Sequence, residues 1–253
     1  MDHQWLQNNF ALSDGVYQSK DDFKIFEDAY IKVREKEHRV LNIAQIRQLP
    51  FVAKNNPDFD LWEIRRKNLS RFLNYLSKKK QCKILDVGCG NGFFVNAMAV
   101  QQHQVIGMDI NLTELKQAAE AFPLKNIAWL KADIFDAPFL KTSFDIITFC
   151  TSFHYFKESD KLIRHCLSML NPGGEIHIID SPFYDNKQLN LAKLNSEKYY
   201  QQMGVPEMTG FFHHISFTTI KTFNPVILYQ PKPRLNKILR RKDSPFYWIK
   251  IIK

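Results

Sequence analysis

Short apolar runs and amphipathic stretches alternate through the middle of the chain. Continuous apolar runs predict buried strands, and helical spacing begins again at 94–100, directly after the first run. Alternation of this kind is typical of a parallel sheet with helices on both faces. The pattern therefore predicts an α/β fold. The expected strands cover 84–87, 105–109, 127–133, 144–150 and 175–180.

The N-terminal part shows helical rather than strand-like spacing. Apolar residues recur at helical intervals over 21–37 and 62–76. The first stretch carries one apolar stripe, which we expect to pack on the sheet. The stripe consists of Phe23, Phe26, Tyr30 and Val33. Residues 1–78 are therefore predicted to form a helical extension before the domain at 79–253.

The C-terminal part returns to strands after one more helix. A turn at 170–174 (Leu-Asn-Pro-Gly-Gly) precedes the fifth strand. A loop at 181–184 and a helix near 188–203 follow. Two further strands are predicted at 226–229 and 246–252.

The most informative segment runs from Lys83 to Phe93, with the sequence KILDVGCGNGF. Its strand ends in three glycines at alternating positions, which permit a sharp turn and leave no Cβ against a ligand. The helix behind them offers unpaired N–H groups. Asp86 lies inside the strand, where a buried carboxylate needs a donor from the loop N–H groups or a ligand ammonium.

This segment resembles motif I of class I S-adenosylmethionine-dependent methyltransferases, with the pattern D/E-x-G-x-G-x-G. The resemblance implies a Rossmann-like sheet of seven strands, in which strands six and seven pair at one edge and the last is antiparallel. It implies S-adenosylmethionine as cofactor, S-adenosylhomocysteine as product, and a lid formed by the N-terminal helices. The C-terminal third is similar to a poorly characterised bacterial branch of the family, which implies no particular acceptor.

Two acids at strand ends are expected to hold the nucleoside. Asp109 can accept from both ribose hydroxyls; the alternative is an N-cap for the helix that starts near Leu112. The resemblance implies that Asp133 accepts from the adenine amino group and that the next N–H meets a ring nitrogen. The alternative for Asp133 is an Asx-turn, and Asp136 competes for the adenine role.

An arginine in the extension is the candidate partner for the methionine carboxylate. The donor fork of Arg65 matches a carboxylate, although a solvated helix face is the alternative. The full set of predicted cofactor residues is Arg65, Asp86, Gly88, Cys89, Gly90, Gly92, Asp109, Ile110, Asp133, Ile134, Phe149 and Cys150.

The segment 151–156 follows the fourth strand and should face the acceptor, because open α/β sheets bind ligands beyond the carboxyl ends of their strands. His154 is the candidate catalytic base, with a core or capping histidine as the alternative. The predicted acceptor-binding residues are Tyr155, Tyr184, His213 and His214. These aromatic residues suit an apolar acceptor, or a packed core. No metal site is predicted.

Composition indicates the size of the core and the cellular compartment. The chain has 253 residues, of which 45% are hydrophobic, enough for one sizeable core. Its four cysteines form no C-x-x-C pair, which favours free thiols in a reducing compartment. The first ten residues lack a basic start and an apolar core, and no apolar stretch approaches membrane-spanning length. We therefore expect a cytoplasmic protein.

Charge gathers at the C-terminus. Residues 232–253 contain eight Lys or Arg and one acid, which gives +7 of the formal +9. Such a tract can contact phosphates, but a solvated surface is favoured. The expected function is methyl transfer to a small or medium-sized acceptor, whose identity and accepting atom the sequence does not name.

Two other functions stay open. A nucleic-acid methyltransferase would use the basic tract, but the chain lacks an Asn/Asp-Pro-Pro-Tyr-type motif and a catalytic Pro-Cys pair. A non-catalytic S-adenosylmethionine-binding protein is the third possibility, against which the intact glycines and Asp109 argue.

Overall fold

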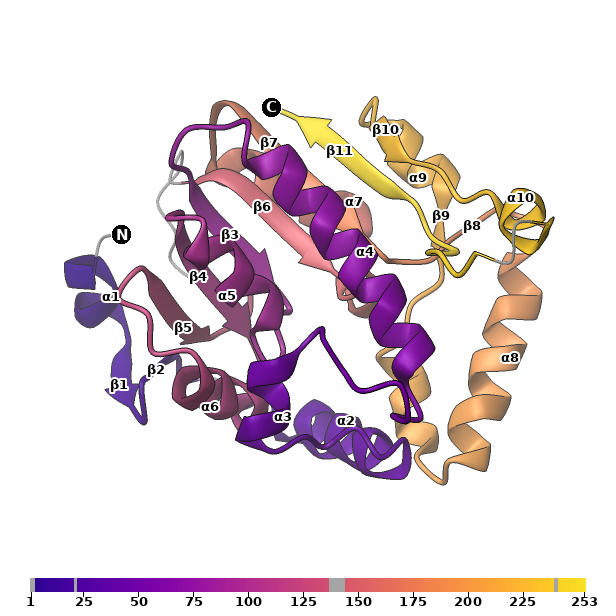
Figure 1. Cartoon of the computed structure of the whole chain (residues 1–253), viewed down its shortest axis with the longest axis horizontal. Coiled ribbons are helices and arrows are strands. Elements are labelled where there is room, and N and C mark those ends of the chain that lie inside the picture. Colours follow the sequence, from indigo (N-terminus) through magenta and orange to yellow (C-terminus); the bar gives the residue numbers. More distant parts are fainter. Residues whose placement is uncertain (1–2, 21, 137–143, 239–240) are drawn as a thin grey trace.

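The computed structural model describes residues 3–20, 22–136, 144–238 and 241–253. Within them, one sheet crosses the molecule and helices cover both of its faces (Figure 1). The strands, in order across the sheet, are β1 (Ala11–Ser13), β2 (Val16–Gln18), β5 (Ile127–Lys131), β4 (Gln104–Asp109), β3 (Lys83–Val87), β6 (Phe144–Cys150), β7 (Leu170–Ile179), β11 (Trp248–Ile252) and β10 (Val226–Tyr229).

The strand directions confirm the Rossmann-like prediction. The five central strands, β5, β4, β3, β6 and β7, run parallel. The last strand, β11, pairs antiparallel with both β7 and β10. The expected pairing of the sixth and seventh strands at one edge is therefore confirmed.

The predicted count of seven strands was wrong, because an N-terminal hairpin extends the opposite edge. Strands β1 and β2 pair antiparallel, and β2 joins β5 in parallel. The turn between them is Asp14-Gly15, with φ of 51° and 76°. Positive φ at both positions is the signature of a tight hairpin turn, for which Asp-Gly is a favoured pair. Each strand has only three residues, too few for a visible alternation.

The predicted helices are confirmed, with small shifts at their ends, although Asp21 lies outside the described residues. They are α2 (Lys24–Lys36), α4 (Phe59–Leu76), α5 (Phe93–Val100), α6 (Leu112–Ala121) and α8 (Leu189–Gln202). The described residues also form helices that were not predicted: α1 (His3–Asn9), α3 (Ile43–Gln48), α7 (Ser159–Met169), α9 (Phe217–Lys221), α10 (Pro233–Ile238) and the 3₁₀ helices η1 (Phe153–Tyr155) and η2 (Pro206–Gly210). Among the helices described, none combines the length and apolarity needed to cross a membrane.

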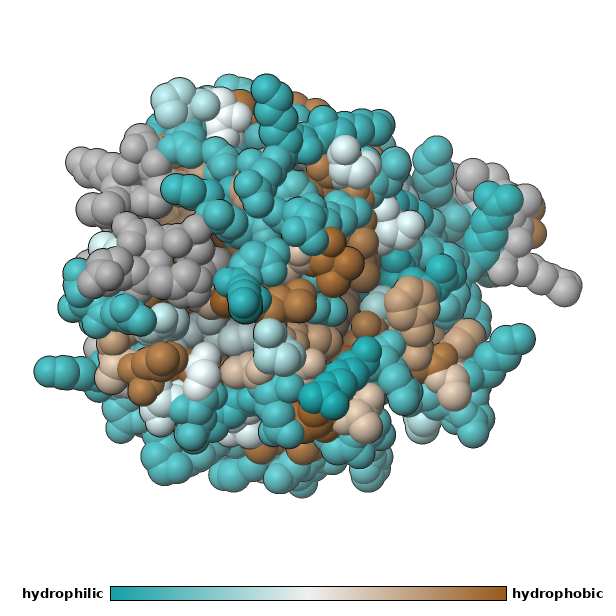
Figure 2. Space-filling model, turned by 60° about the vertical axis from the view of Figure 1, so that its left-hand side comes forward, coloured by the Kyte–Doolittle hydropathy of each residue, from teal (hydrophilic) through white to brown (hydrophobic). Residues whose placement is uncertain are grey.

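Two apolar cores lie on opposite faces of the sheet. Along β3, Ile84 belongs to the core under α4, α5 and α6, and Leu85 belongs to the core that contains α7. Side chains of a strand alternate between faces, so a strand buried on both faces is apolar throughout. Hydrophilic residues cover most of the face in Figure 2, and hydrophobic residues are exposed mainly in its middle.

Helix α2 does not pack on the sheet as the stripe predicted. Val33 belongs instead to a third apolar cluster with Tyr200 of α8 and Met208 of η2. Phe26 and Tyr30 of the same stripe line a cavity. Val33 is buried and the other three residues of the stripe are half-buried, and the prediction that the stripe packs on the sheet was wrong. The division of the chain at residue 78 and the lid role of the extension stay predictions.

Two smaller differences concern the C-terminal part. The Asn-Pro-Gly-Gly turn is a bulge within β7, because Leu170 pairs with Phe144 and Glu175 already pairs with Ile146. The segment after β7, expected to be a loop, forms a short strand, β8 (Phe183–Tyr184), parallel to β9 (Ile215–Ser216).

Candidate cofactor site

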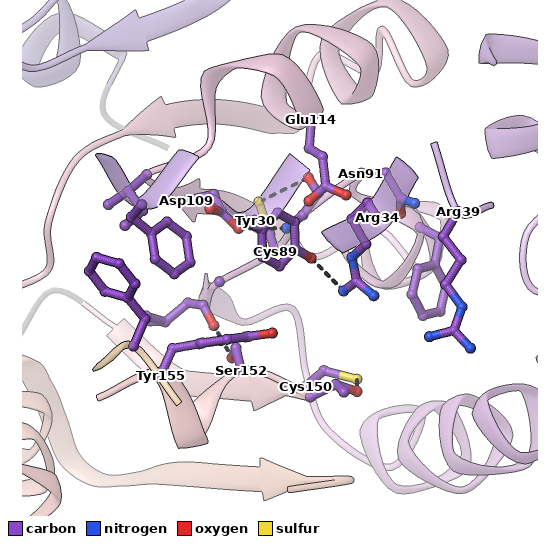
Figure 3. A pocket seen from close by; sticks show the side chains of 18 of the residues that line it. Tyr30, Arg34, Arg39, Cys89, Asn91, Asp109, Glu114, Cys150, Ser152 and Tyr155 are labelled. Carbon is purple, nitrogen blue, oxygen red and sulfur yellow. Dashed lines mark hydrogen bonds between the residues drawn. The ribbon is translucent and has the colours of Figure 1, made fainter. Parts of the chain in front are cut away.

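A cavity of about 820 Å³ opens where β3, β4, β5 and β6 end (Figure 3). The sheet contributes the segments 87–91, 108–110, 132–134 and 150–152 to its lining. Residues of α2 and α4, and Phe211 directly after η2, line it from other sides. This position, beyond the carboxyl ends of the central strands, is the one predicted from the sequence.

The three glycines of the loop serve different purposes. A Cβ on Gly88 would overlap Ser152, and one on Gly92 would overlap the Trp129 ring. A Cβ on Gly90 would instead lie 3.0 Å from Oε2 of Glu114, at the cavity wall. Gly88 and Gly90 line the cavity, whereas Gly92 gives β5 and α6 room to pack.

Asp86 is buried in β3 and does not line the cavity. The hydroxyl of Thr148, on the neighbouring strand β6, donates a 2.5 Å hydrogen bond to its Oδ1. Burial raises the pKa of Asp86 to about 7, and the hydrogen bond from Thr148 opposes that rise. A loop N–H or a ligand ammonium was the donor predicted from the sequence. Thr148 could not be predicted as the donor, because only the strand register brings the two residues together.

Asp109 ties the glycine loop to the end of β4. Its Oδ2 accepts from the Gly90 N–H at 2.8 Å, and its Oδ1 accepts from the Asn111 N–H at 2.9 Å. Asn111, not Asp109, caps α6, because the Asn111 side chain accepts from the Glu114 N–H. Burial raises the pKa of Asp109, and these backbone donors oppose that rise. The carboxylate faces the cavity beside the loop.

Asp133 lines the cavity together with Ala132 and Ile134, just beyond β5. Its Oδ1 accepts from the Phe135 N–H at 2.8 Å, which is the Asx-turn considered as its alternative. Asp136, the competitor for the adenine role, is absent from the lining. The turn fixes Asp133 at the cavity edge and leaves its proposed contact with a base untested.

Arg65 of α4 lines the cavity and lies over the Trp62 ring, with Cζ 4.7 Å from the ring centroid. Its Nε is buried and has no hydrogen-bond partner among the described residues. Burial lowers the pKa of Arg65, and the nearby charge of Arg34 lowers it further. A buried N–H group without an acceptor is costly. This unpaired donor fits an anionic group such as a carboxylate.

The two other arginines of the lining already have partners. Arg39 forms two 2.8 Å hydrogen bonds with the carboxylate of Asp58. Arg34 donates to Glu37 at 3.0 Å. It also donates to the Tyr30 hydroxyl at 2.5 Å (Figure 3). Arg34 and Arg39 could not be predicted as cavity residues, because nothing in the sequence pattern separates a cavity arginine from a surface one.

Aromatic rings form one wall of the cavity. Phe26 packs edge-on against Tyr155 and Phe211, with ring centroids 5.7 and 5.1 Å away, and stacks on Tyr30 at 5.6 Å. These four residues, which we call the aromatic wall, come from α2, η1 and the end of η2. Tyr155 is the one predicted acceptor-binding residue that lines the cavity.

The other acceptor-side predictions lie apart from the lining. His154 is buried behind it, with ring centroids 4.4 Å from Tyr155 and 4.7 Å from Phe212. Burial lowers the pKa of His154 to about 3, and its Nδ1 has no partner. His214 accepts or donates a 2.9 Å hydrogen bond with Ser196 and packs against Tyr184. Five of the residues predicted from the sequence do not line the cavity: Phe149, His154, Tyr184, His213 and His214.

The cysteines are free thiols. Cys89 and Cys150 line the cavity, and burial raises the pKa of both. Protonated thiols of this kind are weak nucleophiles, so we assign them to the wall. Among the described residues, no cluster of His, Cys, Asp or Glu could hold a metal ion.

Part of the basic C-terminal tract is paired with acidic side chains. Lys250 pairs with Glu175 at 3.2 Å, and Lys242 pairs with Asp60 at 2.5 Å. The single acid of the tract, Asp243, pairs with Arg71 at 2.5 Å. Arg240 lies outside the described residues.

Comparison with known proteins agrees with this geometry. Residues 84–174 match a family described as a methyltransferase domain. An uncharacterized methyltransferase of Mycobacterium tuberculosis is 29% identical over 99 residues, which are 39% of this chain and 50% of that protein. The chain therefore spans about half the length of the curated relatives it first matches.

Two solved structures share the fold. YcgJ from Bacillus subtilis gives a TM-score of 0.57 at 15% identity and covers 74% of this chain and 98% of its own. Phosphoethanolamine N-methyltransferase 2 of Haemonchus contortus, bound to phosphomonomethylethanolamine and S-adenosylhomocysteine, gives 0.59 at 19% identity. That match covers 85% of this chain and 48% of the other. The glycine motif, the sheet order and the family match agree with one another: residues 84–174 form a methyltransferase domain, and the chain as a whole has the fold of these solved structures.

Proposed function

We propose that this chain binds S-adenosylmethionine in the cavity and transfers its methyl group to a small or medium-sized acceptor. The observation that carries the proposal is the arrangement of three polar anchors around one cavity. Asp109 ends β4, Asp133 follows β5, and Arg65 has a buried Nε with no partner in the described part of the chain. A ribose, an adenine and a carboxylate are the three polar parts of the cofactor, and each anchor suits one of them.

The assignment of each anchor follows from its chemistry. Asp109 retains acceptor capacity for the ribose hydroxyls, because each of its oxygens has two lone pairs and accepts a hydrogen bond from one backbone N–H, that of Gly90 or of Asn111. Asp133 suits the adenine amino group, with the N–H of Ile134 beside it. Arg65 suits the methionine carboxylate. The backbone at Gly88, Cys89 and Gly90 lets the chain of the cofactor pass closely.

The cavity has room for a second molecule. Its volume of about 820 Å³ is near the upper end of the range for ligand pockets, roughly 300–1,000 Å³. The aromatic wall lines the part formed by α2, η1 and η2, outside the strand ends that carry the anchors. Aromatic rings favour an acceptor with an apolar or flat surface, so we place the acceptor against this wall.

In this proposal the protein contributes by orienting the methyl donor and the acceptor and by excluding water from the cavity. A sulfonium supplies an already activated methyl group. The chain therefore has to hold donor and acceptor in line, which lowers the entropic part of the barrier, and to keep water out. Tyr30 and Tyr155 bring the hydroxyl groups of the aromatic wall. A base is needed only for an acceptor that must lose a proton.

His154 was predicted as that base, and we propose a different role for it. Its ring packs behind Tyr155, and burial favours the neutral form, with a pKa of about 3. A side chain in this position holds Tyr155 against the cavity. We therefore propose His154 as a positioning residue.

The test is transfer of a labelled methyl group. Protein incubated with tritiated S-adenosylmethionine and fractionated cell extract should label one product, which mass spectrometry then identifies. A folded Gly90→Val variant is the blank, because its side chain would project toward Glu114 at the cavity wall. Label in no fraction, with cofactor binding intact, would favour the non-catalytic alternative. Label in nucleic acid would favour the nucleic-acid alternative.

A further inference from the structure

Glu114 is a carboxylate that lines the cavity but has no role in the cofactor binding proposed above. It lies in the first turn of α6, and its Oε2 would be 3.0 Å from a Cβ on Gly90 (Figure 3). The cation that acts most strongly on it, Arg34, forms its ion pair with Glu37. No salt bridge within the described part of the chain includes Glu114.

Helix capping does not account for this carboxylate. Glu114 is the third residue of α6, where an acid often accepts from the backbone N–H of the capping residue. Here the Asn111 N–H donates to Asp109 instead. The side chain of Glu114 is thereby free to point into the cavity, which it lines.

Charged groups surround Glu114 on several sides. Asp109 of β4 raises its pKa, whereas Arg34 of α2, Arg65 of α4 and a hydrogen bond from Tyr30 lower it. Burial is the largest effect, and the pKa of Glu114 rises to about 7. Burial and the nearby acids, Glu114 among them, raise the pKa of the Cys89 thiol, which therefore stays protonated. The carboxylate therefore changes its charge near neutral pH.

The position of Glu114 relative to the anchors identifies its ligand. It lies beside Gly90, whose N–H donates to Asp109, the proposed ribose anchor. It is also within electrostatic reach of Arg65, the proposed carboxylate anchor. In S-adenosylmethionine the sulfonium lies between the ribose and the amino-acid end. A cavity carboxylate that interacts with both anchors is therefore suited to face the middle of the cofactor.

We propose that Glu114 distinguishes S-adenosylmethionine from S-adenosylhomocysteine through its charge on the sulfonium. This inference rests on the proposed function. The two molecules share adenine, ribose, ammonium and carboxylate, and the first carries one more positive charge. An ionised Glu114 therefore attracts the cofactor more than the product, which loses that charge when the methyl group leaves.

The preference should depend on pH in a defined direction. Above about pH 7 the carboxylate is ionised and attracts the sulfonium; below it, the proton removes the attraction. Affinity for S-adenosylmethionine should rise through this range. Affinity for S-adenosylhomocysteine should change less, because that ligand has no charge at the sulfur.

Calorimetry with both ligands at about pH 6 and about pH 8 tests the inference. We expect Glu114→Gln to weaken S-adenosylmethionine binding about tenfold at the higher pH and to change S-adenosylhomocysteine binding by less than about twofold. Glu120→Gln is the matched control, because Glu120 is an exposed acid of the same helix that does not line the cavity. An analogue with an amine in place of the S-methyl group should behave like the cofactor.

Other results of the titrations would overturn either the inference or the proposed function. Equal weakening of both ligands by Glu114→Gln would assign the carboxylate to the ribose or the ammonium and overturn the inference. An unchanged ratio of the two affinities at both pH values would also overturn it. Failure of the wild-type protein to bind either ligand would instead contradict the proposed function.

Discussion

The hydroxyl of Thr148 donates a 2.5 Å hydrogen bond to the carboxylate of Asp86, across the pair of strands β3 and β6. Both side chains are buried, with exposed fractions of 0% and 1%. The acid that begins the glycine motif is thus satisfied from inside the sheet. The N–H groups of Gly88 and Cys89 meanwhile donate to the carbonyl of Met108.

Removing this donor should destabilise the fold. Thr148→Val keeps the shape and leaves the Asp86 carboxylate without its side-chain donor, so we expect the free energy of unfolding to fall by about 1–3 kcal/mol. The loss should be larger at about pH 8 than at about pH 5, because the donor favours the charged form. Urea unfolding at both pH values measures it. Thr148→Ser should lose much less, and equal losses in the two variants would refute the role of the hydroxyl.

The pKa of Asp86 predicts how stability varies with pH. Its folded pKa of about 7 lies above the ordinary value of 3.8. The neutral carboxyl therefore stabilises the fold fully below about pH 4, and that contribution is lost as pH rises through 7. Asp86→Asn is always neutral and can still accept from Thr148. We expect the free energy of unfolding of Asp86→Asn, relative to that of the wild type, to increase between about pH 4 and pH 8. A difference between the two proteins that does not change with pH would contradict this.

Gly92 and Gly173 form a matched pair, because both adopt a positive φ, 79° and 73°. A Cβ on Gly92 would also overlap Trp129, whereas one on Gly173 would meet nothing within 4 Å. Gly173→Ala should cost only backbone strain, about 1–2 kcal/mol. Gly92→Ala should cost roughly 2–5 kcal/mol, because overpacking adds to the strain. Equal losses in thermal or urea unfolding would show that the contact with Trp129 is easily relieved.

Arg65 should affect binding and stability in opposite directions. Arg65→Met removes a cation whose buried Nε finds no hydrogen-bond partner in the ranges that the structure describes, so we expect the ligand-free protein to be at least as stable as the wild type. Binding of S-adenosylmethionine should weaken about ten- to a hundredfold, as expected for loss of a charge-assisted hydrogen bond. Calorimetry and urea unfolding check the two parts. Arg66→Met, at a neighbouring residue paired with Glu63, is the control and should leave binding unchanged.

Much of the fold could be predicted because strands buried on both faces are apolar throughout. The runs at β3, β4 and β6 are of this kind. The hairpin of β1 and β2 could not be found by periodicity, since each strand has three residues and β1 is exposed. The Asp14-Gly15 pair was the available signal for its turn.

The site was predictable where a residue follows directly from a strand end. Gly90, Asp109 and Asp133 line the cavity because consecutive parallel strands end at the same edge. Residues brought in by helices carry no such signal. Tyr30 and Glu114 sit on amphipathic helices, where a cavity-facing side chain and a core-facing one have the same spacing.

His213 and His214 show the limit of reasoning from proximity in sequence. The N–H of His213 donates to the carbonyl of His154, so the two segments do meet. His214 packs against Phe212, which itself packs on His154. The side chains that meet there form a layer behind the cavity, and the direction in which each points depends on packing that the sequence does not display.

The most direct test of the account is a calorimetric titration of S-adenosylmethionine into the wild-type protein and into Gly90→Val. Gly90 adopts a φ of 51° and lines the cavity beside Asp109 and Glu114, so a branched side chain there should obstruct the ligand. Circular dichroism and thermal unfolding would establish that the variant is folded. The account predicts saturable binding with one site in the wild type and none in the folded variant. Absence of binding in the wild type, or the same affinity in both proteins, would contradict it.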